Sequence, residues 1–318
     1  MQHFLLSSQA RTLSLKGVFR MTDDQAYQIF CELRWPETDG EAVCPRCGCC
    51  ETYSITSRRR FKCVGCHHQF SVTSGTIFAS RKLSFVDLLA AIAIFVNGAK
   101  GVAALQLSRD LDVQYKTAFV LTHKLREAMQ AENAKAVLDG VVEVDGAYFG
   151  GYVKPANYKE ARRDRRLLAN RSGKRQSVVV ARERGGDIVT VTAKSEAKGS
   201  NMILAHIDGR ATVHADEASH WDDLHAAFET RRINHSVCYS DGAACTNMAE
   251  SYFSRLRRAE IGTHHHIAGP YLNAYASEMG WREEHRRVPN GMQATLVGAA
   301  AMDAPVSRKW AGYWQRAA

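Results

Sequence analysis

Three acidic residues stand at the ends of predicted secondary-structure elements. Asp145 ends a short β-branched strand, Asp216 ends a later strand, and Glu250 opens a long helix. Carboxylate oxygens are the ligands that hard divalent cations such as Mg²⁺ prefer, and two such ions can activate a hydroxyl and stabilise the leaving oxygen of a phosphodiester. We therefore predict a metal site for phosphoryl transfer at these three acids. The competing candidates are Glu143, which shares a strand face with Asp145, and, more weakly, Glu217 and Asp241.

A second metal site is predicted from cysteine spacing. Four of the nine cysteines form two C-x2-C pairs with fifteen residues between the pairs, namely Cys44, Cys47, Cys63 and Cys66. This is the spacing of a zinc ribbon, and four thiolates fill the coordination sphere, so the Zn²⁺ would be structural. Nearby residues that could replace a ligand are Cys49, Cys50, His67 and His68, and free or redox-active thiols are the alternative interpretation of the four cysteines.

The segment between the two cysteine pairs is basic. It contains Arg59 and Arg60 in the run 57–62 (SRRRFK), which we predict to contact DNA phosphates at the tip of a hairpin. A solvated charged turn is the alternative interpretation.

Helical patterns dominate the rest of the first half. Thr22 and Gln25 have the spacing of a capping box at a helix start, and an apolar helix is predicted over 84–96. The segments 102–111 and 115–126 resemble a helix-turn-helix, in which Lys116 and Lys124 of the second helix would contact DNA. An ordinary helical hairpin is the alternative.

From residue 141 the pattern alternates between strands and helices. The predicted strands are 141–145, 177–180, 187–192, 211–216 and 236–239, and the predicted helices are 201–207, 221–228, 247–260 and 271–287. Gly185 and Gly186 indicate a hairpin between the second and third strands. This order predicts an α/β RNase H-like domain, a mixed sheet flanked by helices. The stretch after Val288, rich in alanine, is expected to be weakly packed.

Several motifs occur in a fixed order along the chain. They are 34–36 (RWP), 44–47 (CPRC), 70–78 (FSVTSGTIF), 142–151 (VEVDGAYFGG) and 246–258 (TNMAESYFSRLRR). With these motifs the chain resembles, over about residues 21–287, the insertion-sequence DDE transposases that carry an N-terminal zinc ribbon and an RNase H-like catalytic domain.

The resemblance assigns roles to individual residues. It implies that Asp145, Asp216 and Glu250 are the catalytic triad, binding Mg²⁺ or Mn²⁺. It also implies that Arg257, seven residues after Glu250 and on the same helix face, touches DNA, and we give Arg258 the same role. The family often has Lys where Arg257 stands, and commonly has another acid where this chain has Gly146.

The charge of the chain is concentrated after the first catalytic strand. The 318 residues carry a formal net charge of +9, and the segment 154–175 contains nine basic residues and two acids. We predict that this loop, including Lys174 and Arg175, lies along DNA, with a solvated loop as the alternative. The longest apolar run, 88–96, is too short for the roughly 20 residues of a membrane span, and no secretory signal is recognisable.

These observations predict a division into five parts. They are an N-terminal helical segment (1–40), the zinc ribbon (41–80), a helix-turn-helix-like segment (81–135), the RNase H-like domain (136–290) and a C-terminal tail (291–318). We expect a cytoplasmic enzyme, nucleoid-associated when bound, that binds terminal inverted repeats of double-stranded DNA as a homo-oligomer, cleaves the ends and joins them to target DNA. The alternatives are a sequence-specific DNA-binding regulator, perhaps a domesticated inactive transposase, and an RNase H-like nuclease without transposition.

Overall fold

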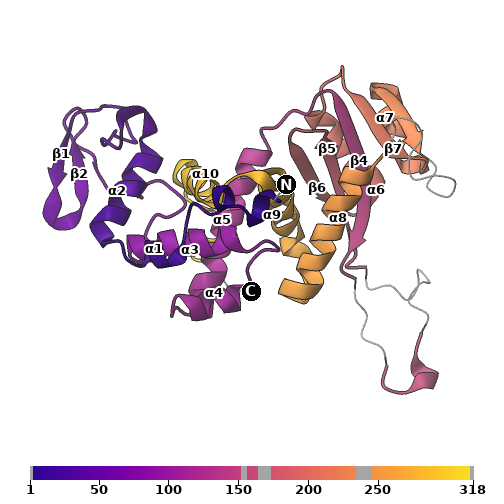
Figure 1. Ribbon diagram of the computed structural model, residues 1–318, viewed down its shortest axis with the longest axis horizontal. Coiled ribbons are helices and arrows are strands. Elements are labelled where there is room, and N and C mark those ends of the chain that lie inside the picture. Colours follow the sequence, from indigo (N-terminus) through magenta and orange to yellow (C-terminus); the bar gives the residue numbers. More distant parts are fainter. Residues whose placement is uncertain (1–2, 152–155, 164–172, 234–244, 316–318) are drawn as a thin grey trace. The chain divides into compact units, whose positions relative to one another are not determined.

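The computed structural model describes residues 3–151, 156–163, 173–233 and 245–315. The chain divides into two compact units, one made of Met1–Glu132 and His285–Ala318 and the other of Asn133–Glu284 (Figure 1). Within the described ranges, no helix combines the length and the apolar character that crossing a membrane requires.

After two short 3₁₀ turns, the first unit contains the helices α1 (Leu15–Val18) and α2 (Asp23–Arg34). The predicted capping box at the start of α2 is confirmed. The Thr22 hydroxyl accepts from the Gln25 amide at 3.2 Å, and the Gln25 side chain accepts from the Thr22 amide at 2.8 Å. Two of the free amide groups of the first turn are thereby satisfied.

The zinc ribbon follows as a small antiparallel sheet in the order β1-β2-β3, formed by Thr52–Ile55, Arg60–Cys63 and Gln69–Phe70. Its apolar contacts are aromatic: the ring of Phe61 lies 5.6 Å from those of both Trp35 and Phe70. Such a small sheet buries little apolar surface, so we expect its stability to depend on a zinc ion bound by the four cysteines.

Three helices complete the middle of the first unit: α3 (Phe85–Asn97), α4 (Ala104–Asp110) and α5 (Tyr115–Asn133). The hydroxyl of Ser84 accepts from the Asp87 amide at 3.0 Å and caps α3, which is buried over most of its length. The turn between α4 and α5 is tight, with Asp112 at a φ of 51°. The predicted helices are therefore present, and α4 and α5 form the helix-turn-helix-like pair.

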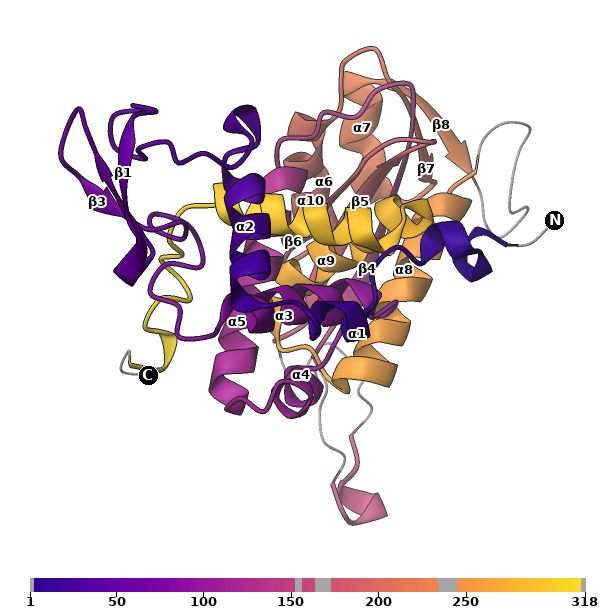
Figure 2. The same ribbon diagram turned by 60° about the vertical axis from the view of Figure 1, so that its left-hand side comes forward.

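The prediction of a weakly packed C-terminal tail was wrong. The helix α10 (Asn290–Asp303) packs against α2 and α3 within the first unit and buries Ala294, Val297 and Ala301 (Figure 2). A Cβ on Gly298 would lie 2.8 Å from Leu33 Cδ1, so the absence of a side chain allows this close approach. The small residues that suggested weak packing are thus the reason the helix can pack so closely.

The second unit is built on a five-stranded mixed sheet in the order β6-β5-β4-β7-β8. The strands are β4 (Val141–Phe149), β5 (Gln176–Glu183), β6 (Ile188–Ala193), β7 (Thr212–Asp216) and β8 (Glu229–Ile233). The first three pair antiparallel, whereas β7 is parallel to both β4 and β8. This is the predicted RNase H-like sheet, with Gly185 at a φ of 84° in the β5–β6 turn.

Four helices cover the two faces of this sheet (Figure 1). The helices α6 (Glu196–Ile203) and α7 (Asp222–Ala227) share one core with Val142 and Val144. The helices α8 (Asn247–Ala259) and α9 (Leu272–Glu284) share the other with Ala147 and Phe149. Odd-numbered residues of β4 therefore face α8, as strand alternation requires.

Three details of the second unit differ from the prediction. Asp145 lies in the middle of β4 rather than at its end, because pairing with β5 continues to Phe149. The helix predicted at 201–207 begins earlier, at Glu196, where the Ser195 side chain caps it. The last sheet strand described is β8, which had been missed; the predicted strand 236–239 lies outside the described residues.

Candidate functional site

Two aspartates lie side by side in the central pair of parallel strands. The register of β4 and β7 places Glu143 beside His214, and two residues further along the same register brings Asp145 beside Asp216. Residues two apart on a strand share a face, so both carboxylates lie on the α8 side of the sheet. Asp216 Oδ1 accepts from the Ala218 amide at 3.0 Å, which holds its side chain at the strand end.

The helix α8 brings a third acid to the same place. A cavity of about 480 Å³ is lined by Asp145, Glu250, Phe253, Ser254, Arg257 and Arg258. Positions 250, 253, 254, 257 and 258 recur at helical spacing, so one face of α8 carries both the acid and the two guanidinium groups. We call Asp145, Asp216 and Glu250 together the acidic site.

The acids of this site interact electrostatically. The pKa of Asp145 is raised to about 6, chiefly by burial and also by the charges of Asp216, Glu250 and Glu196, while the hydrogen bond from the Gly146 amide opposes the rise. Mutually repelling carboxylates are a donor set that fits hard divalent cations. Among the described residues, only the four zinc-ribbon cysteines form a group whose ligand atoms all lie within 4.8 Å of one another.

The raised pKa of Asp145 predicts a pH-dependent cost to stability. The value is about 6 in the folded chain against 3.8 for an ordinary Asp. Protonation of Asp145 therefore stabilises the folded state. This stabilisation is complete below pH 3.8, the pKa of an ordinary Asp, and is lost as the pH rises through about 6, the pKa in the folded chain. Asp145→Asn should raise the free energy of unfolding of the second unit by about 3 kcal/mol near pH 8 without divalent cations. Urea unfolding in magnesium-free buffer measures this gain, which should vanish towards pH 3.

The matched control for this prediction is Asp223→Asn, because Asp223 is an exposed aspartate on α7. It removes the same charge from the same unit, and we expect little change at either pH. If Asp145→Asn had the same free energy of unfolding as the wild type near pH 8, the prediction that the charged carboxylate destabilises the second unit would be wrong.

Gly146 is explained by a fourth carboxylate. A Cβ at this position would lie 2.7 Å from Cγ of Glu196, the first residue of α6. Burial raises the pKa of Glu196, with the His220 and Arg175 charges opposing and the Asp216 charge adding. The side chain of Glu196 thus occupies the space that a side chain at position 146 would need. Sequence analysis missed Glu196, since only the fold brings 146 and 196 together.

Glu143, which had competed for a place among the metal ligands, instead caps α8. Its carboxylate is fully buried, and Oε2 accepts from the amides of Met248 at 2.7 Å and Ala249 at 3.3 Å. The Thr246 side chain makes no capping bond to this helix, so Glu143 satisfies amide groups that the local sequence leaves open. An acid at a helix N-terminus is also favoured by the helix dipole. Glu143 therefore fixes the helix turn that carries Glu250.

The charge of Glu143 is balanced by Arg184, the residue that follows β5. Its Nε donates to Glu143 Oε1 at 2.8 Å, and its Nη2 donates to His214 Nδ1 at 3.1 Å and to the Cys245 carbonyl oxygen at 3.2 Å. His214 Nδ1 also accepts from the Cys245 amide at 3.3 Å, so the ring is neutral, and burial lowers its pKa. Three strands and the segment before α8 are joined by this buried polar network.

Removal of the Glu143 carboxylate should be strongly destabilising. Glu143→Ala leaves Arg184 without its buried partner and two amides of α8 without an acceptor, at a cost of about 3 to 5 kcal/mol. Urea unfolding measures the total, and hydrogen exchange of the Met248 and Ala249 amides reports the loss of the cap. Glu143→Gln keeps an acceptor oxygen at nearly the same volume, and should protect those amides better than Ala does. Equal exchange in the two variants would contradict the capping role.

The predicted DNA-contacting residues of the second unit are partly gathered at the acidic site. Arg257 and Arg258 line the same cavity as Asp145 and Glu250. Arg175 lies just before β5, with its guanidinium 4.0 Å from the ring centre of Tyr148, and Lys174 precedes it. Much of the predicted basic loop 154–175 lies outside the described residues.

The predicted DNA-contacting residues of the first unit differ from one another in their surroundings. Arg59 is engaged in ion pairs with Asp23 and Asp24 of α2, so its guanidinium ties the zinc hairpin to that helix, whereas Arg60 is exposed. The predicted phosphate contact therefore fits Arg60 better than Arg59. Lys116 and Lys124 of α5 line a cavity together with residues of the C-terminal segment.

The four cysteines form a site that fits zinc. The Sγ atoms of Cys44 and Cys66 lie 3.6 Å apart and those of Cys47 and Cys63 lie 3.5 Å apart. Tetrahedral zinc with bonds of about 2.3 Å to sulfur requires separations of about 3.8 Å. Gly48 has a φ of 72° beside the first knuckle, while His67 rather than Gly65 takes the left-handed conformation beside the second, at 57°.

Comparison with protein families gives two matches. Residues 21–69 match the transposase zinc-ribbon domain, and residues 137–284 match the ISXO2-like transposase domain. Together the two matches cover more than half of the chain, and the second coincides closely with the second compact unit. No curated protein matches the chain.

Proposed function

Because the chain belongs to the IS1595-type DDE transposases of insertion sequences, with a zinc ribbon before an ISXO2-like catalytic domain, we propose that it cleaves DNA at the ends of such an element and joins the 3′ ends to target DNA. The observation that carries this proposal is the single cavity in which Asp145 and Glu250 meet Arg257 and Arg258. Acids that can hold metal ions beside cations that can hold phosphate are what phosphodiester chemistry requires.

The acidic site has the metal-binding role in this proposal. Asp145, Asp216 and Glu250 would hold Mg²⁺ or Mn²⁺, which when bound activates the attacking water or 3′-hydroxyl and stabilises the leaving oxygen. Arg257 and Arg258 hold the phosphate backbone across the cavity. Glu143 keeps α8, and with it Glu250, in position against β4.

Recognition of the element ends belongs to the first unit. The zinc ribbon offers Arg60 on an exposed hairpin, and the α4–α5 pair offers further cations for phosphate contacts. Synapsis of two ends requires at least two copies of the chain, so we propose that it works as a homo-oligomer on cytoplasmic DNA.

The deciding experiment incubates the full-length protein with Mg²⁺ and DNA carrying the inverted repeats that flank its gene. We expect nicks at the repeat ends and, with target DNA present, joined products. Binding without cleavage would point instead to a DNA-binding regulator. Cleavage at any sequence without joined products would point to a nuclease. Either result would overturn the proposal.

A further inference from the structure

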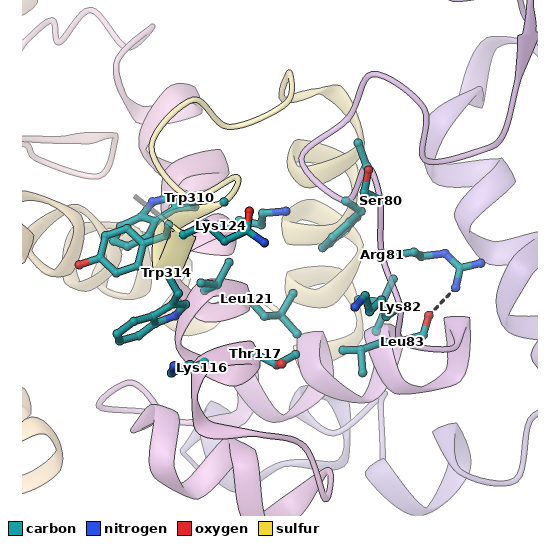
Figure 3. A pocket seen from close by; sticks show the side chains of 17 residues that line it. Ser80, Arg81, Lys82, Leu83, Lys116, Thr117, Leu121, Lys124, Trp310 and Trp314 are labelled. Atoms are coloured by element: carbon teal, nitrogen blue, oxygen red, sulfur yellow. Dashed lines mark hydrogen bonds between the residues drawn. The ribbon is translucent and has the colours of Figure 1, made fainter. Parts of the chain in front are cut away.

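The first unit contains a second cavity, distant in sequence from the acidic site. Its volume is about 320 Å³, within the range of small-molecule pockets. Its walls are the segment 78–83 before α3, one face of α5, and the C-terminal segment 310–315. Figure 3 shows Trp310 and Trp314 on one side of this pocket, Arg81 to Leu83 on the other, and Leu121 between them. We call it the aromatic pocket.

One wall of the aromatic pocket is a fixed group of rings. Trp310 is buried and stacks on His123, with centroids 4.2 Å apart and planes inclined by 19°. Tyr313 lies 4.9 Å from Trp310 and 5.2 Å from Trp314. Trp314 itself is 47% exposed. The buried rings therefore hold in place an indole that is open to a ligand.

The rim and floor of the aromatic pocket carry only positive charge. Of its seventeen lining residues, all within the described ranges, four are cationic and none is acidic; the cations are Arg81, Lys82, Lys116 and Lys124. Lys116 Nζ lies 5.2 Å from the ring centre of Trp314. Burial lowers the pKa of Lys124, against the charge of Glu127. Ammonium groups held partly out of water beside an aromatic face favour an anionic ligand that also has an apolar, planar part.

A paired duplex does not meet this description. Its bases are stacked inside the helix, so it presents phosphates but no planar group that could enter a cavity of this size. An unpaired nucleotide presents both, because its base stacks on an aromatic ring while its phosphates meet lysine side chains. The face of α5 that was expected to contact a DNA groove is the face against which Trp310 and Trp314 pack. Because these side chains cover that face, we expect DNA to contact the pocket and not α5 alone.

We propose that the aromatic pocket binds an unpaired nucleotide of a DNA strand, with the base against Trp314 and the flanking phosphates at Lys116 and Lys124. The inference builds on the proposed function and adds a binding site for single-stranded DNA to the duplex contacts proposed for other parts of the chain. It gives the chain a means to hold a frayed or nicked strand at an element end.

The test compares two DNA probes in magnesium-free buffer: a short blunt duplex, and the same duplex with a single-stranded thymidine overhang. Fluorescence anisotropy should show that the full-length protein binds the overhang probe more tightly than the blunt one. Trp314→Ala should weaken overhang binding by about tenfold without changing blunt-duplex binding, and Trp314→Phe, which keeps a ring, should retain most of the affinity. Lys116→Ala should lower the salt slope for the overhang probe by about 1.

Two control variants change exposed residues of the first unit that do not line the pocket: Phe19→Ala for the aromatic side chain and Lys100→Ala for the charge. Neither should alter the preference for the overhang. Equal binding of both probes by the wild type, or an equal loss for both probes in Trp314→Ala, would overturn the pocket assignment while leaving the transposase proposal intact. Failure to bind either probe would instead count against DNA binding as a whole.

Discussion

Asp145→Asn should lower the rate of strand cleavage at element ends by at least about 1,000-fold, the effect of losing about 4 kcal/mol of transition-state stabilisation. The amide keeps the size of the carboxylate but not its charge, so the acidic site loses a proposed metal ligand while the strand pairing of β4 is kept. Affinity for end DNA should change little, because the cations that would hold phosphate remain. Single-turnover cleavage and a binding titration on the same DNA separate the two effects.

Asp216→Asn should give the same pattern, since Asp216 is the neighbour of Asp145 in the adjacent parallel strand. Asp223→Asn, which removes an exposed acid of the same unit, serves as the control and should cleave at the wild-type rate. Cleavage at undiminished rate by the Asp145 variant would remove the acidic site from the reaction. A parallel loss of DNA binding would show that the carboxylate acts on folding or on recognition instead.

Local patterns were sufficient for the parts of the fold that are held together locally. Thr22 and Gln25 lie within one helix turn, and the four cysteines lie within one short ribbon, so spacing alone predicted both the cap and the metal site. The order of strands and helices likewise predicted the RNase H-like sheet, because hairpins and parallel crossovers leave few topologies open.

The predictions failed where the outcome depends on a partner distant in sequence. An alanine-rich helix is marginal alone, and α10 is ordered because α2 and α3 accept its small residues at short range. The ion pairs of Arg59 with the two acids at the start of α2 were likewise not foreseen, and its DNA contact stays a prediction. In both cases the chain neighbours of a residue gave no sign of the group that it meets in the fold.

The acidic site contains residues whose place could be predicted from local patterns and residues whose role depends on partners distant in sequence. The grouping of Asp145, Asp216 and Glu250 could be proposed from the order of elements, because strand alternation and helix position bring the three acids to one face of the sheet. The roles of Glu143 and Glu196 could not, since one depends on the start of α8 and the other on the space above Gly146. An acid inside a run of valines was the only sequence signal that Glu143 has a buried partner.

The zinc ribbon leads to the second large prediction. Cys63→Ser should abolish zinc binding and unfold the ribbon, because a small three-stranded sheet has little apolar core and structural zinc contributes about 10 to 16 kcal/mol to the folding of such modules. Cys63 is fully buried and its Sγ also accepts from the Cys66 amide at 3.4 Å. Metal analysis should find no bound zinc, and limited proteolysis should cut within 41–70.

Cys50→Ser separates loss of a ligand from loss of any thiol in the ribbon. Cys50 is exposed and lies outside the four-cysteine group, so this variant should keep one zinc per chain and resist proteolysis as the wild type does. The second compact unit holds its own sheet and both of its cores, so hydrogen exchange in β4 and β5 should be the same in both cysteine variants. Stoichiometric zinc in Cys63→Ser would show that another group has replaced the thiolate, and Cys49 would then be the first residue to substitute in the same background.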